Sequence, residues 1–241
     1  MEHWESLRPG GLRFVWDDDL FPPGTDTFLL SSLPRLRPGL RVCDLGCGTG
    51  LLSLLLLQRQ GGLYVTGVEL HPGAAALLEQ AAAENGLTGR LTACRGDLRE
   101  IRSLLPAGRF DLAVCNPPYY PAQSGKLPRE AAAQSARAET ACTLKDVCAA
   151  AAWLLRWGGS LCLVHRPERL TDLLCALRDA ALEPKRLRTV CRRAEDAPSL
   201  VLVEARRGGK PGLTWEPPLI LETAEGRPTE ELDRIYFRAG T

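Results

Sequence analysis

The chain has 241 residues, of which 45% are hydrophobic and 24% are charged, and its formal net charge is +1. This length suits one α/β domain with small additions, and the apolar content is enough for a sizeable core. A net charge near zero excludes a global field that would draw the protein onto nucleic acid. Any contact with nucleic acid must therefore come from a local patch.

The nine cysteines and three histidines do not form a metal-binding pattern. The sequence has no Cys-x-x-Cys pair, and His3, His71 and His165 are far apart. Most cysteines lie among apolar residues, which is typical of free thiols packed in a reducing compartment. We therefore expect no metal. The longest apolar run, Leu51–Leu57, is far shorter than the ~20 residues of a membrane span, and no leader is recognisable. We predict a cytoplasmic protein without membrane association.

Apolar runs separated by Gly and Pro predict alternating strands and helices. After a turn-rich segment over residues 1–25, a first helix is expected at Asp26–Leu33. The expected strands are Arg41–Asp44, Tyr64–Glu69, Leu91–Cys94, Asp111–Cys115 and Ser160–His165. The expected helices between them are Gly50–Gln60, Pro72–Asn85, Leu98–Leu104 and Thr140–Trp157. Strict alternation predicts a parallel sheet with helices on both faces.

The last third of the chain should add an antiparallel pair of strands. A helix at Leu170–Leu182 precedes strands at Arg186–Arg192 and Leu200–Ala205, and a reversal near residues 195–198 joins those strands. A final helix should begin at Thr229, whose hydroxyl suits an N-cap. The fold class is therefore α/β, with a seven-stranded, mostly parallel sheet. We expect an N-terminal extension over residues 1–40, the main domain over 41–206 and a C-terminal extension over 207–241.

A glycine-rich turn, Asp44-Leu45-Gly46-Cys47-Gly48-Thr49-Gly50, follows the first strand and opens a helix. Glycines in such a turn let the backbone approach a ligand closely. The turn indicates a nucleotide-like cofactor, either NAD or S-adenosylmethionine. The spacing is Gly-x-Gly-x-Gly, and position 51, where a pyrophosphate-binding turn has a glycine, is a leucine. That spacing favours S-adenosylmethionine.

Acidic residues end the next two strands. Glu69 is placed to accept hydrogen bonds from a ribose diol, although an acid there also suits a solvated helix N-terminus. Asp97 could accept a hydrogen bond from an adenine amino group, and its alternative role is a helix N-cap. The adjoining Leu70 and Leu98, together with Asn116 after the fourth strand, complete the predicted cofactor site.

The segment Asn116-Pro117-Pro118-Tyr119 follows the fourth strand, at the carboxyl edge where open α/β sheets bind ligands. Its prolines stiffen the backbone, so that the Asn116 side-chain oxygen and the Pro117 carbonyl can point the same way. Two such acceptors would hold the hydrogens of a planar amine and localise its lone pair toward a methyl donor. Tyr119 could stack on the base. We therefore predict methylation of a planar amino group. No strong base is needed, because the product amine loses its proton readily.

These motifs resemble those of the class I S-adenosylmethionine-dependent methyltransferases. More narrowly, the chain resembles the bacterial tRNA1(Val) (adenine(37)-N6)-methyltransferase family over nearly its whole length. The resemblance includes Gly24-Thr25-Asp26-Thr27-Phe28, Gly67-Val68-Glu69, Asn116-Pro117-Pro118-Tyr119-Tyr120 and Val164-His165-Arg166-Pro167-Glu168-Arg169-Leu170. It implies a Rossmann-like methyltransferase fold, S-adenosylmethionine as cofactor, S-adenosylhomocysteine as product, and N6 of adenine 37 in tRNA as target.

The same resemblance implies roles for individual residues. Asp26 would lie near the methionine end of the cofactor, and Gly46, Gly48 and Gly50 would line it. Glu69 would bind the ribose, Asp97 would lie near the adenine, and Asn116 to Tyr119 would hold the target amine. The chain departs from the family over residues 122–140, where substrate-facing residues are expected.

RNA phosphates could be bound by the basic strands near the end of the chain. Between residues 185 and 210 there are eight Lys or Arg and three acids. The predicted phosphate contacts are Lys185, Arg186, Arg188, Arg192 and Arg193, and the alternative is a solvated face of two edge strands.

Two other functions stay open from the residues alone. The chain could methylate a protein glutamine or another planar amide or amine. It could also be a non-catalytic scaffold, although the intact glycine turn and Asn116 argue against that reading.

Overall fold

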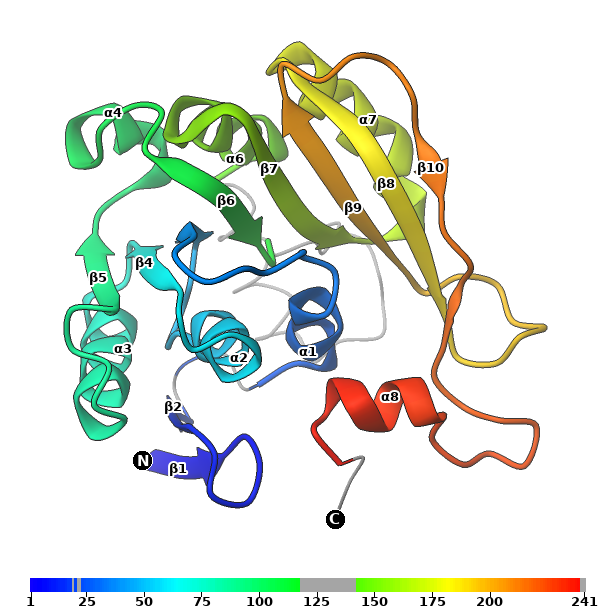
Figure 1. Ribbon diagram of the computed structural model, residues 1–241, viewed down its shortest axis with the longest axis horizontal. Helices are drawn as coiled ribbons and strands as arrows, with labels where there is room; N and C mark the ends of the chain where they lie inside the picture. The colour runs from blue at the N-terminus through cyan, green and yellow to red at the C-terminus, as the bar shows by residue number, and fades with distance from the viewer. Residues whose placement is uncertain (19, 21–22, 118–141, 239–241) are drawn as a thin grey trace.

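A computed structural model describes residues 1–18, 20, 23–117 and 142–238. Its main sheet has nine strands in the order β10-β8-β9-β7-β6-β3-β4-β5, with β11 also paired to β8 (Figure 1). Seven strands form the body of this sheet: β3 Arg41–Leu45, β4 Tyr64–Glu69, β5 Leu91–Arg95, β6 Phe110–Cys115, β7 Leu155–His165, β8 Leu182–Cys191 and β9 Leu200–Arg207. The predicted α/β class with a seven-stranded core is confirmed. The two further strands are short, β10 at Thr214–Trp215 and β11 at Leu219–Ile220.

Strand direction follows the prediction. β3, β4, β5, β6 and β7 are mutually parallel, whereas β9 runs antiparallel to both β7 and β8. Parallel neighbours bring their carboxyl ends to one edge of the sheet. The residues after β3, β4, β5 and β6 therefore meet at that edge.

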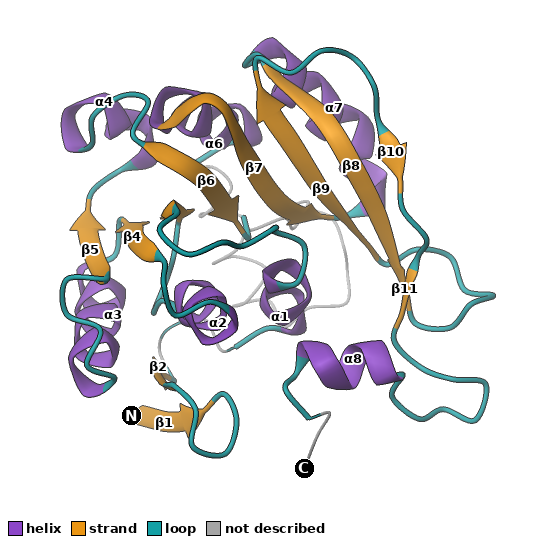
Figure 2. Ribbon diagram, in the orientation of Figure 1, coloured by secondary structure: helices purple, strands orange, loops and turns teal. Residues whose placement is uncertain are grey.

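Helices cover both faces of the sheet (Figure 2). Their bounds are α1 Thr25–Ser31, α2 Leu51–Arg59, α3 Pro72–Glu84, α4 Ile101–Leu104, α6 Leu144–Leu154, α7 Leu170–Asp179 and α8 Glu230–Ile235, with short 3₁₀ turns at Leu98–Glu100 and Pro167–Arg169. One buried apolar cluster lies under α1, α2 and α3, and a second lies under α4, α6 and α7. Alternate residues of β3 divide between the clusters, because successive side chains of a strand point to opposite faces.

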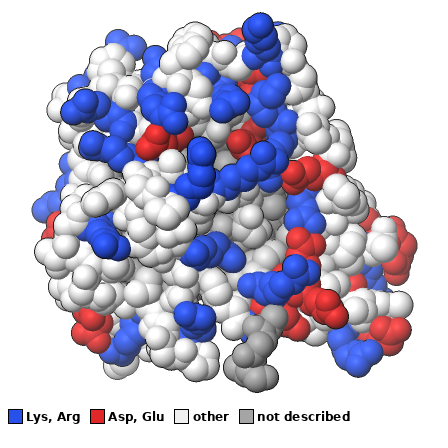
Figure 3. Space-filling view, in the orientation of Figure 1, with Lys and Arg blue, Asp and Glu red and all other residues white. Residues whose placement is uncertain are grey.

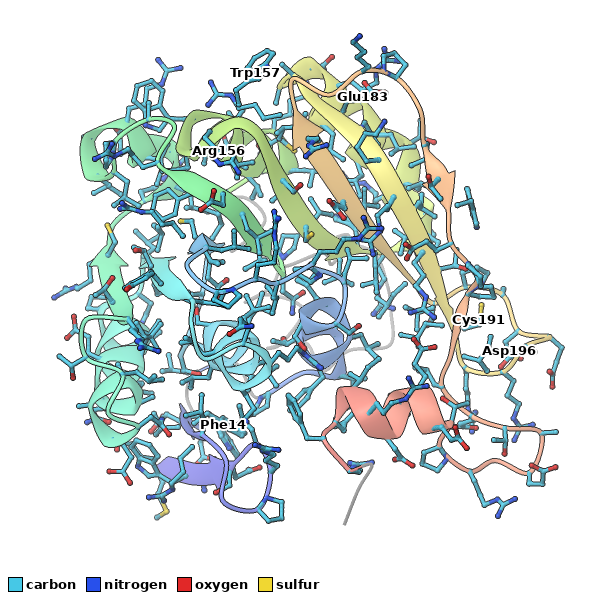
Figure 4. The ribbon with its side chains drawn as sticks, viewed as in Figure 1. Phe14, Arg156, Trp157, Glu183, Cys191 and Asp196 are labelled. Atoms are coloured by element: carbon cyan, nitrogen blue, oxygen red, sulfur yellow. The ribbon has the colours of Figure 1, made fainter. Side chains whose placement is uncertain are left out.

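The predicted helix Thr140–Trp157 is too long at its C-terminal end. Thr143 caps α6 with Asp146 in a capping box, and the helix ends at Leu154. Leu155 is already extended and pairs with Phe110 of β6, so Arg156 and Trp157 belong to β7 (Figure 4). Pairing with a distant strand overrides the helical propensity of this segment.

Two other boundaries differ from the prediction. α7 ends at Asp179 rather than at residue 182, and Ala181 adopts a positive φ of 56°. β8 therefore starts at Leu182, four residues before the predicted start. The predicted reversal between the last two long strands is confirmed by their antiparallel pairing.

The first seventeen residues contain a hairpin that the sequence did not predict. β1 (Glu2–Ser6) pairs antiparallel with β2 (Arg13–Asp17). Phe14 and Val15 are buried in the cluster under α2 and α3, and Asn85 at the end of α3 exchanges two hydrogen bonds with the backbone of Arg13. The hairpin is thus held by tertiary packing, since an isolated hairpin is only marginally stable.

The C-terminal segment returns across the molecule to α1 (Figure 1). The Thr229 hydroxyl caps α8, as predicted. The Tyr236 ring stacks on Phe28 of α1 with centroids 4.4 Å apart and planes 5° from parallel. Arg59 of α2 donates a hydrogen bond to the Ile235 carbonyl at 2.7 Å. The division of the chain at residues 40 and 206 stays a prediction.

Candidate active site

The glycine turn is hydrogen-bonded to the neighbouring strand, β4, at the carboxyl edge of the sheet. The Gly46 and Cys47 amides both donate to the Val68 carbonyl of β4, at 2.9 and 3.1 Å. Gly46 and Gly48 have φ of +68° and +56°, which disfavours any residue with a side chain. Apart from its neighbours in the chain, a methyl group on either glycine would meet no atom of the described residues within 4 Å. The described residues therefore leave room for a group the size of a side chain beside the turn, and contact with a cofactor stays a prediction.

The Glu69 carboxylate is fixed beside this turn. Its Oε2 accepts from the Gly48 amide at 2.8 Å, and its Oε1 accepts from the His71 amide at 2.7 Å. This pair of bonds joins the turn to the start of α3. Leu70, the next residue, is 58% exposed, which is unusual for a leucine in this chain and leaves an apolar surface beside the turn. The geometry suits a ribose and a flat apolar ring, and both contacts stay predictions.

Asp44 lies beneath the turn, since it is only 1% exposed. The Ser53 hydroxyl of α2 donates to Asp44 Oδ2 at 2.7 Å. Burial raises the pKa of Asp44 to about 7. The hydrogen bond from Ser53 has the smaller, opposite effect, because it favours the charged form of the carboxyl group. Asp44 thus ties β3 to α2 under the turn, and a direct contact with a cofactor stays a prediction.

The carboxylate of Asp97 is already engaged. Its Oδ1 accepts from the Arg99 amide at 2.9 Å, which is the helix N-cap considered as its alternative role. The Arg99 guanidinium also binds both carboxylate oxygens, and this hydrogen bonding holds the pKa of Asp97 below its usual range. Leu98 follows, half-buried, in the 3₁₀ turn. Contact with an adenine stays a prediction for both residues.

The end of β6 and the start of α1 meet at the same edge, although some 90 residues separate them in the chain. The Asn116 Nδ2 donates to the Thr27 hydroxyl oxygen at 2.9 Å. Pro117 is buried, and Pro118 and Tyr119 lie outside the described residues. Asp26 precedes Thr27, and burial raises its pKa while the charge of Arg166 opposes that rise. The structure therefore brings Thr27 and Asn116 together, and Asp26 precedes Thr27 in α1.

Two residues at this edge were missed by the sequence analysis as site residues. Thr27 is one of them, because nothing in its spacing reveals a bond to Asn116. The other is His165, which ends β7 and is 4% exposed. The Arg166 amide donates to His165 Nδ1 at 2.9 Å, and burial lowers the pKa of His165 to about 4. The imidazole is therefore neutral at neutral pH.

Four of the five cations predicted to bind phosphate are paired with carboxylates of the same chain. Arg186 binds Glu204 and Glu216, Arg188 binds Glu231, and Arg192 and Arg193 approach Glu222. The hydrogen bond from Arg192 holds the pKa of Glu222 below its usual range. Lys185 donates to the Lys210 carbonyl at 3.0 Å.

Acidic and basic side chains are interspersed at the right of the view in Figure 3, whereas Lys and Arg predominate over its upper part. Most of the acids lie in the C-terminal segment, outside the window in which the charges were counted. The predicted excess of positive charge on β8 is thus largely cancelled.

Within the described residues, no group of three or more His, Cys, Asp and Glu side chains could hold a metal ion. None of the helices in that part of the chain combines the length and apolar character that crossing a bilayer requires.

The sheet order, the glycine turn and Glu69 at the end of β4 are those expected of a Rossmann-like, S-adenosylmethionine-dependent methyltransferase. A crystal structure of a predicted O-methyltransferase from Agrobacterium tumefaciens shares this fold, with a TM-score of 0.72 and 22% identity over 90% of this chain and 98% of that one. The family model of the methyltransferase small domain matches residues 15–177.

Two curated relatives are similar over most of the chain. Both are named tRNA1(Val) (adenine(37)-N6)-methyltransferase. The relative from Dickeya chrysanthemi is 31% identical over 87% of this chain and 84% of its own length. The relative from Tolumonas auensis is 32% identical over 89% and 90%. The chain belongs to the methyltransferase small-domain family and, within it, to the family of these adenine-N6 methyltransferases.

Proposed function

We propose that the protein methylates the exocyclic N6 amino group of an adenine in RNA, and that its substrate is adenine 37 in the anticodon loop of a tRNA. The observation that carries the proposal is the placement of Asn116 at the carboxyl edge, with its amide nitrogen bound to Thr27. That bond leaves Oδ1 as the end of the amide available to an incoming amine. The names of the curated relatives support the choice of adenine and tRNA.

The substrate nitrogen is a poor nucleophile, because its lone pair is delocalised into the ring. Asn116 Oδ1 would accept one N–H and the Pro117 carbonyl the other, which directs the lone pair out of the ring plane. Each bond contributes about 0.5–1.5 kcal/mol net, and more where water is excluded. Tyr119 would stack on the base, a contact worth about 1–3 kcal/mol. Flipping an adenine out of a loop also costs little free energy, since the base is not paired.

The cofactor would be held by groups already fixed in place. Gly46 and Gly48 would allow its close approach, Glu69 would accept from its ribose, and Leu70 would cover one face of its adenine. When bound, S-adenosylmethionine supplies an electrophilic methyl group. Neutral His165 adds no charge to this edge. Orientation of the amine toward the methyl group is then the main contribution of the chain.

RNA would be contacted by more than the target base. Because Arg186, Arg188 and Arg192 are paired within the chain, phosphate binding by them would require exchange of those carboxylates. We therefore expect β8 to contribute less to RNA affinity than its charge count indicates. A tRNA substrate also places the enzyme in the cytoplasm.

The test uses labelled S-adenosylmethionine with tRNA from a host lacking the modification, and in parallel with a protein extract. Label recovered from tRNA as N6-methyladenosine supports the proposal. Label in protein alone would refute it in favour of a protein amide substrate, and label in neither would favour the non-catalytic scaffold.

The Asn116→Ala variant tests the site within the same assay. It should lower kcat about a hundredfold, by analogy with the removal of one preorganised hydrogen-bond donor from a transition-state site, which costs about 10²–10³ in rate. It should leave the Kd for S-adenosylmethionine within about twofold, as measured by calorimetry. The matched control is Glu79→Gln on the exposed side of α3, which should match the wild type. Equal loss of turnover and cofactor binding would show that Asn116 has another role.

A further inference from the structure

We infer that Thr27 is a positioning residue, whose hydroxyl holds one end of the Asn116 side-chain amide against α1 so that the other end faces the substrate amine. The inference rests on the proposed function, in which Asn116 accepts a hydrogen bond from that amine. The contact itself joins Asn116 Nδ2 and Thr27 Oγ1 at 2.9 Å. Both residues are at least half-buried, and Thr27 is 9% exposed.

The orientation matters because the two ends of an asparagine amide have similar shape and opposite chemistry. One end is an acceptor, and the other is a double donor. A half-turn of the amide would present an NH₂ group to a substrate that itself offers only N–H groups. That arrangement places donors against donors and removes the acceptor. The Thr27 hydroxyl is a hydrogen-bond partner on the protein side, where its oxygen accepts from Nδ2. Because a hydroxyl can also donate to Oδ1, Thr27 fixes the position of the amide, and the N–H groups of the substrate select the orientation in which Oδ1 faces them.

Thr27 is well placed for this task because α1 is held from several sides. Leu29 and Leu30 are fully buried. Arg59 of α2 donates to the Ser31 hydroxyl at 3.1 Å. The Thr27 amide itself donates to the Gly24 carbonyl at 3.2 Å. The hydroxyl therefore has a fixed position relative to the end of β6, as a group that orients another side chain must have.

A purely structural role for Thr27 would depend on its shape rather than on its hydroxyl. Valine has almost the same shape and lacks the hydroxyl, whereas serine keeps the hydroxyl and lacks the methyl group. The pair Thr27→Val and Thr27→Ser therefore separates hydrogen bonding from packing. Neither substitution changes the charge of the site.

We expect Thr27→Val to lower kcat about tenfold, equivalent to ~1.4 kcal/mol of transition-state free energy. The Kd for S-adenosylmethionine and the thermal midpoint should stay close to the wild-type values. Thr27→Ser should restore kcat to within about twofold. A nuclear magnetic resonance spectrum gives a readout without turnover: the two side-chain amide protons of Asn116 should shift in Thr27→Val and stay near their wild-type positions in Thr27→Ser.

Wild-type kcat in Thr27→Val, or equal losses in the valine and serine variants, would overturn the inference. An unchanged Asn116 amide signal in Thr27→Val would do so as well. Failure of the proposed function looks different. If the wild type labels protein instead of RNA, the same comparison is run on that substrate. If the wild type labels neither protein nor RNA, the Asn116 amide signals in the two Thr27 variants alone test whether the Thr27 hydroxyl positions Asn116. Only the Thr27 comparison bears on the positioning role.

Discussion

Asp44 should make the stability of the folded chain depend on pH. It is fully buried at the end of β3, and burial raises its pKa from 3.8 to about 7. Folding therefore favours the protonated carboxyl group. The stabilisation is fully present below the unfolded pKa and is lost as pH rises through the folded pKa, that is, from about 4 to about 7.

The magnitude follows from proton linkage. Between the two pKa values the unfolded chain has released the proton and the folded chain has kept it. Each pH unit in this window then lowers the free energy of unfolding by about 1.4 kcal/mol, and the whole shift amounts to about 4 kcal/mol. Between pH 5 and pH 8 the loss from Asp44 should be about 2.5 kcal/mol.

The assay compares urea unfolding of the wild type and Asp44→Asn from pH 5 to pH 8, followed by circular dichroism. Asparagine does not titrate, so the difference between the two curves isolates Asp44 from every other group. The wild type should lose about 2.5 kcal/mol relative to the variant over this range. In Ser53→Ala the slope should continue to higher pH, because the Ser53 hydroxyl favours the charged form. Parallel wild-type and Asp44→Asn profiles would refute the reasoning.

Two further substitutions test the support of the glycine turn. Glu69→Gln places an NH₂ group against the amide of either Gly48 or His71. Because a lost charge-assisted hydrogen bond costs about 1.5–3 kcal/mol, the Kd for S-adenosylmethionine, measured by calorimetry, should rise about tenfold or more. An unchanged Kd would contradict the role of Glu69. Gly67→Ala would put a methyl group 2.5 Å from the Cys47 sulfur, and the overpacking should cost about 1–3 kcal/mol in urea unfolding. Gly61→Ala serves as the control and should be close to neutral, because the nearest atom to its added methyl group is the Leu57 carbonyl oxygen at 3.9 Å.

Much of the fold is encoded locally in this chain. The strand–turn–helix unit around Gly46 was predictable, because the turn needs glycines where φ is positive and an apolar helix follows directly. The position of Asn116 was predictable too, since an apolar strand delivers it to the carboxyl edge. The helix cap at Thr229 was predictable too, because a hydroxyl side chain there precedes a helical segment.

Other features depend on partners that are distant in the sequence. Leu155 has good helical propensity and becomes a strand residue because Phe110 offers a pairing partner. The hairpin at the N-terminus is stable because Phe14 and Val15 find a buried surface under α2 and α3. Neither partner is visible in a local window of residues.

The charge pairing along β8 and the residues after it also depends on partners that are distant in the sequence. Counting charges between residues 185 and 210 gave a basic patch, but Glu216, Glu222 and Glu231 lie outside that window and neutralise it. The bond from Asn116 to Thr27 also spans 89 positions. Site geometry of this kind requires the tertiary structure, since no local pattern specifies which side chains meet.

The stack of Tyr236 on Phe28 has a consequence for the order in which the protein matures. Phe28 lies one residue after Thr27, and its aromatic partner is made more than two hundred residues later. A growing chain on the ribosome can form the glycine turn early, yet α1 has no brace from α8 until the final helix has emerged. The helix that carries Thr27 therefore gains this aromatic contact only when synthesis of the chain is nearly finished.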